Sequence, residues 1–374
     1  MNYKPLKDLC DIRKGQAITG NRVVEGRVPV VAGGKTVPYY HNVANRDADI
    51  ITISASGAYA GYVNYWSVPI FASDCTTIKP SVELLTTEYL YAFLKSKQEY
   101  IYSLQKGAGQ PHIYGKDIEN IEIPLPPIDT QRKIAAILDK AQELIDLRKA
   151  QIEKLDDFLR SVFLDMFGDP VTNPKGWEVD RLDNVAEIVS GVAKGRKLVN
   201  QQTVFVPYMR VANVQDGHLV LDEIKQIEVL PSDVTKYALL DGDLLATEGG
   251  DPDKLGRCAI WKGQIKECIH QNHIFRIRLQ TNKVMPEYVS FLMGSKHGKK
   301  YFLRSSKQTT GIASINSTQL KSFPAFLPPL PLQQQFAAIV EKTEQQKTLM
   351  QQSLTEMENN FSSLMQQAFR GELF

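Results

Sequence analysis

The sequence predicts a mixed α/β protein in which two related α/β domains alternate with two long helices. The first observation behind this prediction is a stretch that occurs twice without a gap, at residues 125–167 and 327–369. The second is the heptad spacing of apolar residues inside both copies. The third is a series of short β-rich runs before each copy. A repeat of this length predicts a chain built from two equivalent halves.

Each copy of the repeat begins with two prolines, which cannot lie inside a helix and so mark its start. Apolar residues then recur at steps of four and three, as in a coiled coil. The predicted seam consists of Ile134, Leu138, Ile145, Ile152, Leu155, Leu159 and Val162 in the first copy, and of Phe336, Val340, Met350, Leu354, Met357, Phe361 and Leu364 in the second. We expect the two helices to pair as an antiparallel coiled coil of roughly 50 Å, related by a pseudo-two-fold axis. Pairing between two chains is the alternative.

The domain pattern is read from the segments around the helices. Residues 28–31, 49–53, 62–66 and 76–78 are β-rich, residues 87–104 have the spacing of a helix, and residues 121–123 form a last strand. After a linker at residues 168–174, rich in Gly and Pro, the same order of signals restarts. The predicted division is therefore 1–127 for the first domain, 128–168 for the first helix, 169–329 for the second domain and 330–374 for the second helix.

Composition limits the class of protein. The chain has 374 residues, 43% of them apolar and 23% charged, which allows large cores, and its net charge of +2 leaves any nucleic-acid contact to local patches. The four cysteines form no C-x-x-C pair, which fits a reducing compartment and neither a zinc site nor a disulfide framework. The first residues lack the apolar core of a signal peptide, and no apolar run is long enough to span a membrane. We expect a cytoplasmic protein.

Motifs for catalysis are missing or incomplete. Gly34-Lys35-Thr36 resembles the end of a phosphate-binding loop, but Pro29 stands where the first glycine is required. The Asn/Asp-Pro-Pro-aromatic motif of adenine methyltransferases does not occur. Pro252-Asp253 followed by Lys266 lacks the second carboxylate that a metal-dependent nuclease needs. The histidines show no metal-ligand spacing, and we interpret His270 and His273 as polar surface or loop residues on opposite faces. We therefore predict neither catalytic residues nor a metal site.

The whole layout resembles the specificity subunit of type I restriction–modification systems. The resemblance covers essentially the whole chain. Its most specific parts are LPPIDTQRKIAAILDKAQELIDLRK with its second copy LPPLPLQQQFAAIVEK, the segments PYMRVANVQDGHL and GDLLATEGGDPDKLGRCAI of the second domain, and the loop GAGQPHI. Taken together, these motifs are far more specific than a coiled coil alone.

The resemblance implies that each α/β domain is a target-recognition domain for one half of a bipartite sequence in double-stranded DNA. It implies that the helices set the gap between the halves and dock two modification subunits, which carry S-adenosylmethionine-dependent adenine methyltransferase chemistry. Restriction subunits that use ATP and magnesium can join such a complex. It implies no catalytic role and no bound cofactor for this chain itself.

Residue types suggest where DNA would be contacted, since phosphates bind Lys, Arg and backbone N–H groups, and base edges bind Arg, Asn and Gln. Two loops that precede the helices at equivalent places supply such groups: Lys106, Gly107, Gly109, Gln110 and His112 in one, and Ser306, Lys307, Gln308, Thr309 and Thr310 in the other. Weaker candidates are Arg210 and Asn213, then Lys35, Arg46 and Tyr59, and the basic cluster Lys194, Arg196 and Lys197. The alternatives are ordinary polar turns, a structural ion pair at Arg210 and a solvated face at the cluster.

Two other functions compete with DNA specificity. A recognition chain with its own nuclease or methylase activity would show magnesium- or S-adenosylmethionine-dependent turnover as a purified chain. A coiled-coil scaffold for proteins only would show no salt-sensitive DNA binding, even with modification subunits present. The scaffold explains the helices but leaves two complete α/β domains with equivalent polar loops without a purpose.

Overall fold

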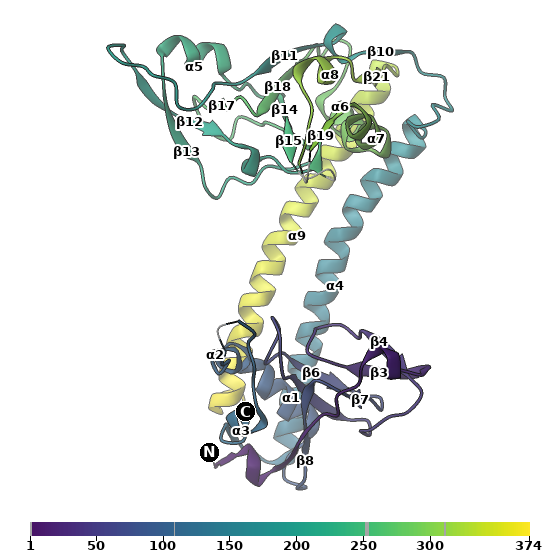
Figure 1. The fold of residues 1–374 in the computed structure, drawn as a ribbon, viewed down its shortest axis with the longest axis vertical. Coiled ribbons are helices and arrows are strands. Elements are labelled where there is room, and N and C mark those ends of the chain that lie inside the picture. Colours follow the sequence, from purple (N-terminus) through teal and green to yellow (C-terminus); the bar gives the residue numbers. More distant parts are fainter. Residues whose placement is uncertain (1, 108, 251–253, 310–311) are drawn as a thin grey trace. The chain divides into compact units, whose positions relative to one another are not determined.

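The computed structural model describes residues 2–107, 109–250, 254–309 and 312–374. These residues form two compact units, the first made of residues 1–151 with 350–374 and the second of residues 152–349. Each unit combines one α/β domain with a part of both long helices (Figure 1). The predicted division gave each helix a segment of its own, whereas the structure shares both helices between the units, because each domain packs against both of them.

The α/β domain of unit 1 is built on two sheets. An antiparallel four-stranded sheet has the order β2-β8-β5-β6, and a second sheet has the order β4-β3-β7, with β3 and β7 parallel. A short ladder of β1 and β9 closes the domain. The strands are β1 (Tyr3–Pro5), β2 (Cys10–Lys14), β3 (Glu25–Val31), β4 (Tyr39–His41), β5 (Ile50–Ser54), β6 (Val63–Trp66), β7 (Phe71–Ala72), β8 (Cys75–Pro80) and β9 (Glu122–Pro124). The predicted strands therefore exist: β3 and β8 are longer than predicted, β5 and β9 are shifted by one residue, and β6 is one residue shorter.

Helices of unit 1 cover the four-stranded sheet on one side. The helix predicted over residues 87–104 is divided at Lys97 into α1 (Thr87–Ser96) and α2 (Gln98–Ser103). Thr86 is the N-cap of α1, and its hydroxyl accepts a hydrogen bond from the backbone N–H of Tyr89 at 3.3 Å. Tyr89, Leu90 and Phe93 are buried and pack with Ile51, Ile53 and Ile78 of the sheet. Two 3-10 turns, η1 (Leu6–Asp8) and η2 (Gly20–Arg22), and α3 (Gly115–Ile118) complete the unit.

Unit 2 repeats this topology. Its sheets have the orders β11-β18-β14-β16 and β13-β12-β17, again with one parallel pair, β12 and β17, and β10 pairs with β21. A three-stranded sheet of order β15-β20-β19 stands where unit 1 has bridges of His112 with Ser56 and Lys106. The strands are β10 (Val179–Arg181), β11 (Ala186–Ser190), β12 (Val204–Met209), β13 (Lys225–Val229), β14 (Leu244–Thr247), β15 (Gly249–Gly250), β16 (Cys258–Ile260), β17 (Ile269–His270), β18 (Ile274–Leu279), β19 (Lys307–Thr309), β20 (Ile312–Ser314) and β21 (Pro324–Phe326). The matching strand orders confirm the predicted repeat of α/β domains.

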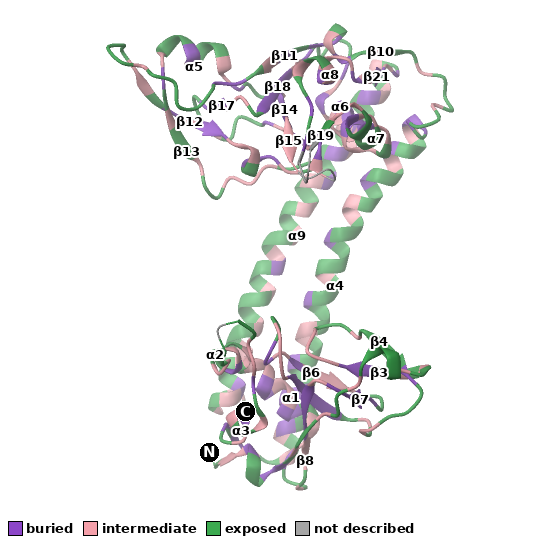
Figure 2. Cartoon of the chain, in the orientation of Figure 1, coloured by how far each residue is buried: buried purple, intermediate pink, exposed green. Residues whose placement is uncertain are grey.

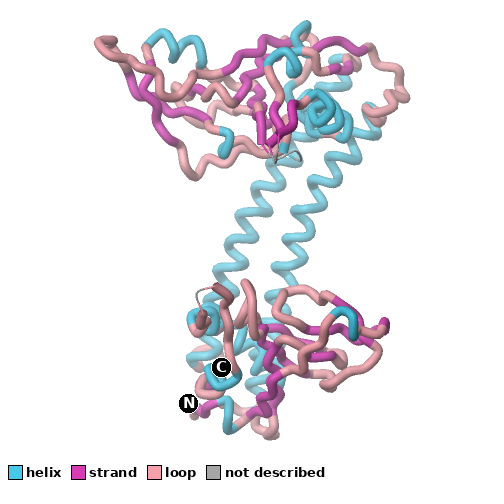
Figure 3. Tube along the Cα trace, in the orientation of Figure 1, coloured by secondary structure: helices cyan, strands magenta, loops and turns pink. Residues whose placement is uncertain are grey.

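The helices of unit 2 are η3 (Leu182–Asn184), η4 (Val211–Asn213), α5 (Pro231–Tyr237), α6 (Pro286–Gly294), α7 (Lys296–Ser305) and α8 (Ser317–Lys321). Helices α6, α7 and α8 follow the order of α1, α2 and α3 in unit 1. The tube view draws the helices of both units in cyan (Figure 3). The pair α6 and α7 corresponds to α1 and α2. Among the described residues, α5 has no counterpart in unit 1, and it belongs to the extra loop length that the sequence of the second domain carries.

The long helices α4 (Ile128–Phe167) and α9 (Leu330–Arg370) pack against each other within both units. In unit 1, Lys149 pairs with Glu358 at 2.8 Å, and in unit 2, Asp156 pairs with Lys347 at 2.6 Å. Residue numbers therefore rise along α4 while they fall along α9, which makes the pairing antiparallel, as predicted. Figure 2 shows buried residues recurring between exposed ones along both helices. Among the helices of the described residues, none is apolar and long enough to cross a membrane.

The seam residues differ in how deeply they are buried. Those with at most 8% of their surface exposed are Ile134, Leu138, Ile145, Ile152, Leu159, Phe336, Val340 and Leu354. Those that are half-buried are Leu155, Val162, Met350, Met357, Phe361 and Leu364. Phe163 and Phe167, which the predicted seam did not include, are buried against Phe336, with ring centroids 5.5 and 5.4 Å apart.

Each long helix is joined to an α/β domain in the same manner at its first turn. The side chain of Gln131 is completely buried, accepts a hydrogen bond from Thr86 N–H at 3.0 Å, and donates to the carbonyls of Leu84 and Pro126. Gln333, at the same place in the repeat, accepts from Met285 N–H at 2.9 Å and donates to the carbonyls of Lys283 and Pro328. Each glutamine therefore fixes the start of its helix to the loop before α1 or α6.

Candidate nucleic-acid interface

A β-hairpin follows α2 in unit 1. Lys106 and His112 exchange two backbone hydrogen bonds, of 3.0 and 2.9 Å, across the loop that sequence analysis singled out. Gly107 has a φ of +103°, and a Cβ atom there would lie 2.7 Å from the carbonyl oxygen of Gln110, so the turn requires glycine. The hairpin is held to the loop after β5 by a hydrogen bond of 3.0 Å from Gly57 N–H to the Pro111 carbonyl.

The corresponding hairpin of unit 2 consists of β19 and β20 and follows α7. It pairs through β20 with β15, in the loop after β14, so it occupies the equivalent place in the topology. The prediction that the two loops are equivalent is thus matched by equivalent backbone pairing. Ser306 is half-buried and Lys307 is exposed. Thr310, Pro252 and Asp253 lie outside the described residues. The side chains of Gln308 and Thr309 also lie outside the described part of the structure.

The side chains of the first hairpin offer both charge and hydrogen-bonding groups. Lys106 is 58% exposed and forms a hydrogen-bonded ion pair with Asp117. The hydrogen bond from Lys106 lowers the pKa of Asp117, and burial opposes this effect only in part. Gly109 and Gln110 are exposed. The ring of His112 is half-buried and stacks on Tyr114 at 6.3 Å between centroids. Lys106 and Gln110 can therefore reach a ligand without rearrangement of the hairpin.

Three weaker candidates of unit 1 occupy different environments. The Lys35 ammonium group lies over the ring of Tyr59 at 4.7 Å, and Tyr59 is 44% exposed, so this cation–π pair presents an aromatic and a charged group together. Arg46 instead donates to Thr77 Oγ1 and to the carbonyls of Asn45 and Lys14, at 2.8 to 3.0 Å. The guanidinium group of Arg46 thereby ties the segment before β5 to the sheet.

Arg210 and Asn213 act on the structure of unit 2. The Arg210 guanidinium group forms an ion pair of 3.0 Å with Glu223 and donates to the Glu223 carbonyl, which is the structural alternative that the sequence left open. Asn213 is 3% exposed; its amide accepts from Arg210 N–H and donates to the carbonyls of Val220 and Glu223. These contacts shape the loop between β12 and β13, and their role in DNA contact stays a prediction.

The basic cluster of Lys194, Arg196 and Lys197, in the loop before β12, contains one cation with an internal partner and two exposed lysines. Lys194 and Lys197 are exposed. Arg196 forms an ion pair with Asp233 of α5, and Asp233 is 7% exposed. Burial alone would raise the pKa of Asp233, but the bonds from Arg196 and from Leu230 N–H outweigh it and leave the pKa lowered. Arg196 therefore anchors the loop on α5, and the two lysines project from an anchored loop.

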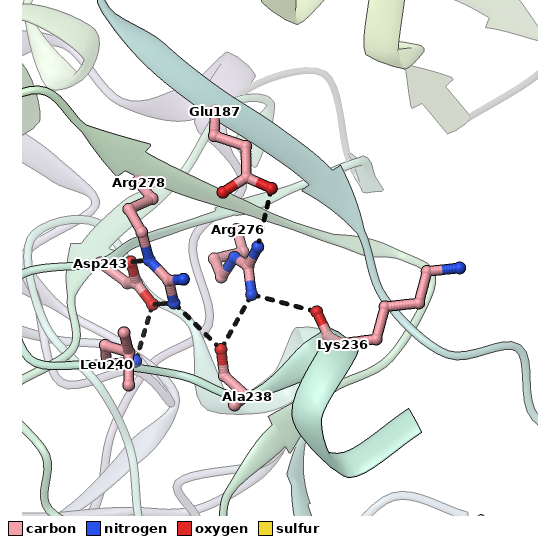
Figure 4. Close-up of polar contacts among 7 residues, drawn as sticks. All are labelled: Glu187, Lys236, Ala238, Leu240, Asp243, Arg276 and Arg278. Carbon is pink, nitrogen blue, oxygen red and sulfur yellow. Dashed lines mark hydrogen bonds and ion pairs between the residues drawn. The ribbon is translucent and has the colours of Figure 1, made fainter. Parts of the chain in front are cut away.

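A buried charged network connects α5 to the four-stranded sheet β11-β18-β14-β16 of unit 2 (Figure 4). Arg276 of β18 is 3% exposed, donates to the carbonyls of Lys236 and Ala238 at the end of α5, and pairs with Glu187 at 3.3 Å. Arg278 pairs with Asp243 at 2.8 Å. This network was not predicted, although the two arginines that alternate with apolar residues in β18 were a signal for it in the sequence.

His270 corrects one prediction. We interpreted it as a polar surface or loop residue, but it lies in β17 with its side chain fully buried. Its Nδ1 atom lies 2.9 Å from the Ile274 carbonyl oxygen, and burial lowers the pKa of His270 to about 4. His273, three positions later, is exposed and pairs with Glu248 at 2.5 Å. Among the described residues, no group of His, Cys, Asp and Glu side chains has an arrangement that could hold a metal ion.

The geometry thus defines a class of protein: two α/β domains of one topology, joined by paired helices, each with a polar hairpin that pairs with the loop after a corresponding strand, β5 or β14. A family model of the type I restriction modification DNA specificity domain matches residues 1–157 and 174–359. The chain belongs to this family of type I restriction–modification specificity subunits, with two target-recognition domains. Such subunits are the non-catalytic DNA-recognition components of restriction–modification complexes.

Individual relatives agree with this assignment. The specificity subunit of the type I restriction enzyme EcoKI from Escherichia coli K12 is 28% identical, over 100% of this chain and 83% of that protein. The StySPI specificity subunit from Salmonella potsdam is 26% identical over the same shares. The fold is similar to the crystal structure of a type I system S subunit from M. genitalium, with a TM-score of 0.60, 16% identity and coverage of 98% and 96% of the two chains.

Proposed function

We propose that each unit recognises one half of a bipartite target in double-stranded DNA, with its hairpin at the contact surface. The observation that carries this proposal is the pair of hairpins. They occupy the same place in the same topology, yet their side chains differ, with Lys106, Gln110 and His112 in one and Ser306 and Lys307 in the other. Equivalent placement with different chemistry suits two domains that bind different half-sites.

In addition to the hairpins, exposed cations of both domains would hold the phosphate backbone. Lys35 with Tyr59 serves this role in unit 1, and Lys194 and Lys197 serve it in unit 2. Phosphate contacts position a protein on the duplex, whereas the hairpin side chains supply the discrimination between bases. The proposed contact surface would be stabilised by internal contacts of Arg46, Arg210, Asn213 and Arg196.

The paired helices would set the gap between half-sites and dock two modification subunits. In support, α4 exposes large apolar side chains that its pairing with α9 leaves uncovered: Ile137 at 38%, Leu144 at 46% and Leu147 at 52% in unit 1, and Phe158 at 49% and Leu164 at 50% in unit 2. Single exposed apolar residues are ordinary, but several along one helix favour a protein interface. S-adenosylmethionine would be bound by those modification subunits, and ATP and magnesium by restriction subunits where these join.

The chain itself would bind no cofactor and would work in the cytoplasm, where its DNA target is. The four cysteines support a reducing location, since each is a free, buried thiol whose pKa burial raises to about 12.

Base-resolution methylation sequencing tests the proposed function. The genome of a host that expresses this chain with its modification subunit is compared with the genome of a host that expresses the modification subunit alone. We expect a new methylated adenine motif in two parts around a fixed gap, present only with this chain. An unchanged methylation pattern, with the complex shown to assemble, would contradict DNA specificity and favour a protein scaffold.

A further inference from the structure

The exposed face of α7 in unit 2 is basic over its whole length. Helical spacing places Lys296, Lys299, Lys300, Leu303 and Arg304 on one side of the helix, and all five are exposed. The sequence of α7, KHGKKYFLRS, contains no carboxylate to neutralise them. This surface is outside every candidate that the sequence suggested, and we refer to Lys296, Lys300 and Arg304 as the α7 stripe.

The cations of α7 differ in whether they have an acidic partner among the described residues. Lys299 forms an ion pair of 2.7 Å with Asp216. Among the described residues, no hydrogen bond or ion pair involves the charged groups of Lys296, Lys300 or Arg304. In a chain with a net charge of only +2, three adjacent cations without acidic partners form a local positive surface.

The opposite face of α7 is fixed in the core of unit 2. Phe302 is fully buried and stacks on Phe323 with centroids 5.2 Å apart, and the Tyr301 hydroxyl donates to the Gln319 carbonyl at 2.7 Å. Gly298 lies so close to α6 that a Cβ atom would be 2.0 Å from the Met293 carbonyl oxygen. The helix therefore presents its cations from a rigid base, and binding would order only the ends of three side chains.

Unit 1 lacks this surface. The corresponding helix α2 has the sequence QEYIYS, with Glu99 on it and without a cation. The position of α7 in the chain adds to the argument, because α7 ends at Ser305 and the hairpin begins at Lys307. The stripe thus adjoins the element proposed to contact bases in unit 2.

We propose that the α7 stripe binds the phosphate backbone of DNA beside the half-site of unit 2, independently of sequence. The proposal rests on the proposed function, since it needs unit 2 to lie on DNA. Lys296 and Arg304 are two turns apart, about 12 Å, a length over which one DNA strand carries about three to four phosphates. The two units would accordingly make unequal numbers of phosphate contacts, with additional contacts made by unit 2.

The test uses the full chain, purified with the subunits that accompany it, and a labelled duplex that contains the methylated motif or a scrambled one. The stripe variant combines Lys296→Gln, Lys300→Gln and Arg304→Gln. A matched control combines Lys262→Gln, Lys266→Gln and Lys283→Gln, three exposed lysines of the same unit. Fluorescence anisotropy gives the affinity at several salt concentrations, thermal unfolding checks the fold, and gel filtration checks the subunit composition.

We expect the stripe variant to lose about 2.7 from the slope of log affinity against log salt, since each neutralised phosphate contributes about 0.9. Binding to both duplexes should weaken by the same factor, so that their ratio stays unchanged, while the control keeps the wild-type slope. A wild-type slope in the stripe variant would overturn the stripe proposal and leave the proposed function intact. Loss of a subunit at an unchanged slope would also overturn it, in favour of an acidic protein partner. A wild-type complex that does not distinguish the two duplexes would overturn both proposals.

Discussion

Buried glutamines show at the residue scale how the repeat is built. Gln131 and Gln333 are fully buried, and each makes hydrogen bonds both to the loop before α1 or α6 and to the proline carbonyl just before its own helix. The aromatic contacts repeat as well: Phe369 packs on Tyr89 at 5.5 Å, and Phe167 packs on Tyr288 at 4.6 Å. Each long helix thus begins on one domain and places its last phenylalanine on the other.

Replacing Gln131 with Ala should lower the free energy of unfolding of unit 1 by about 2 kcal/mol, because three partly buried backbone groups lose their partner. Gln333→Ala should have the same effect on unit 2. Urea unfolding measures both. The control Gln345→Ala, whose amide contacts only the exposed Glu341, should change stability by less than about 0.5 kcal/mol. Equal effects of Gln131→Ala and the control would show that the glutamine contributes nothing to the joint.

His270 should make unit 2 sensitive to acid. Burial holds its folded pKa at about 4, below the ordinary value of 6.5, so the folded state favours neutral imidazole. A depressed folded pKa means that the stability is complete above pH 6.5 and falls as the pH drops from 6.5 toward 4. The loss at pH 5 should be about 2 kcal/mol relative to pH 7.5. Thermal unfolding across this range should show the loss in the wild type and in the exposed control His218→Asn, and little of it in His270→Gln.

At the residue scale, the sequence indicates which polar residues could contact DNA but not which of them contact other groups of the protein instead. Arg210, Asn213 and Arg196 are residue types that can contact either DNA or other groups of the same protein. The carboxylates that pair with the two arginines, Glu223 and Asp233, are not adjacent to them in the sequence, so no local pattern indicates these ion pairs. The burial of His270 follows from the pairing of β17 with β12, a parallel pair that no local pattern reveals. By contrast, the glycine requirement at Gly107 belongs to a local turn, which the sequence GAGQ does indicate.

The long helices were the elements that the sequence predicted best, because prolines mark their starts and a heptad seam runs through both. The shorter helices were harder. The break at Lys97 between α1 and α2 contains neither Gly nor Pro, so the pattern continued across it. Helix α5 was not predicted from the sequence, and its C-terminal end is stabilised by Arg276 from β18 rather than by a local cap.

Shortening both helices by one heptad should shorten the gap in the target and leave its halves unchanged. Removing residues 145–151 and 352–358 together keeps the heptad register, and the two deleted segments face each other in the antiparallel pair. Seven helical residues correspond to about 10 Å, or about three base pairs. Methylation sequencing measures the gap directly. Methylation with the original gap would contradict the spacer role of the helices, and deletion in α4 alone, which breaks the pairing, serves as the negative control.

The whole molecule consists of two units with equal strand orders and unequal surfaces. Both four-stranded sheets, both second sheets and both hairpins correspond, whereas α5 and the basic face of α7 belong to unit 2 among the described residues. The equal framework follows from repeated apolar patterns, which a sequence displays. The unequal surfaces depend on which exposed side chains have partners, and that information exists only once the chain is folded.

The central claim is that each unit specifies one half of the target, and an exchange of one domain tests it most directly. Residues 169–329 are replaced by the corresponding domain of a relative with a different methylated motif, and the methylation pattern of the host is sequenced at base resolution. The account predicts that one half of the motif changes to that of the relative, while the other half and the gap stay as in the wild type. A change in both halves, or in neither, while the complex assembles and methylates DNA, would contradict it.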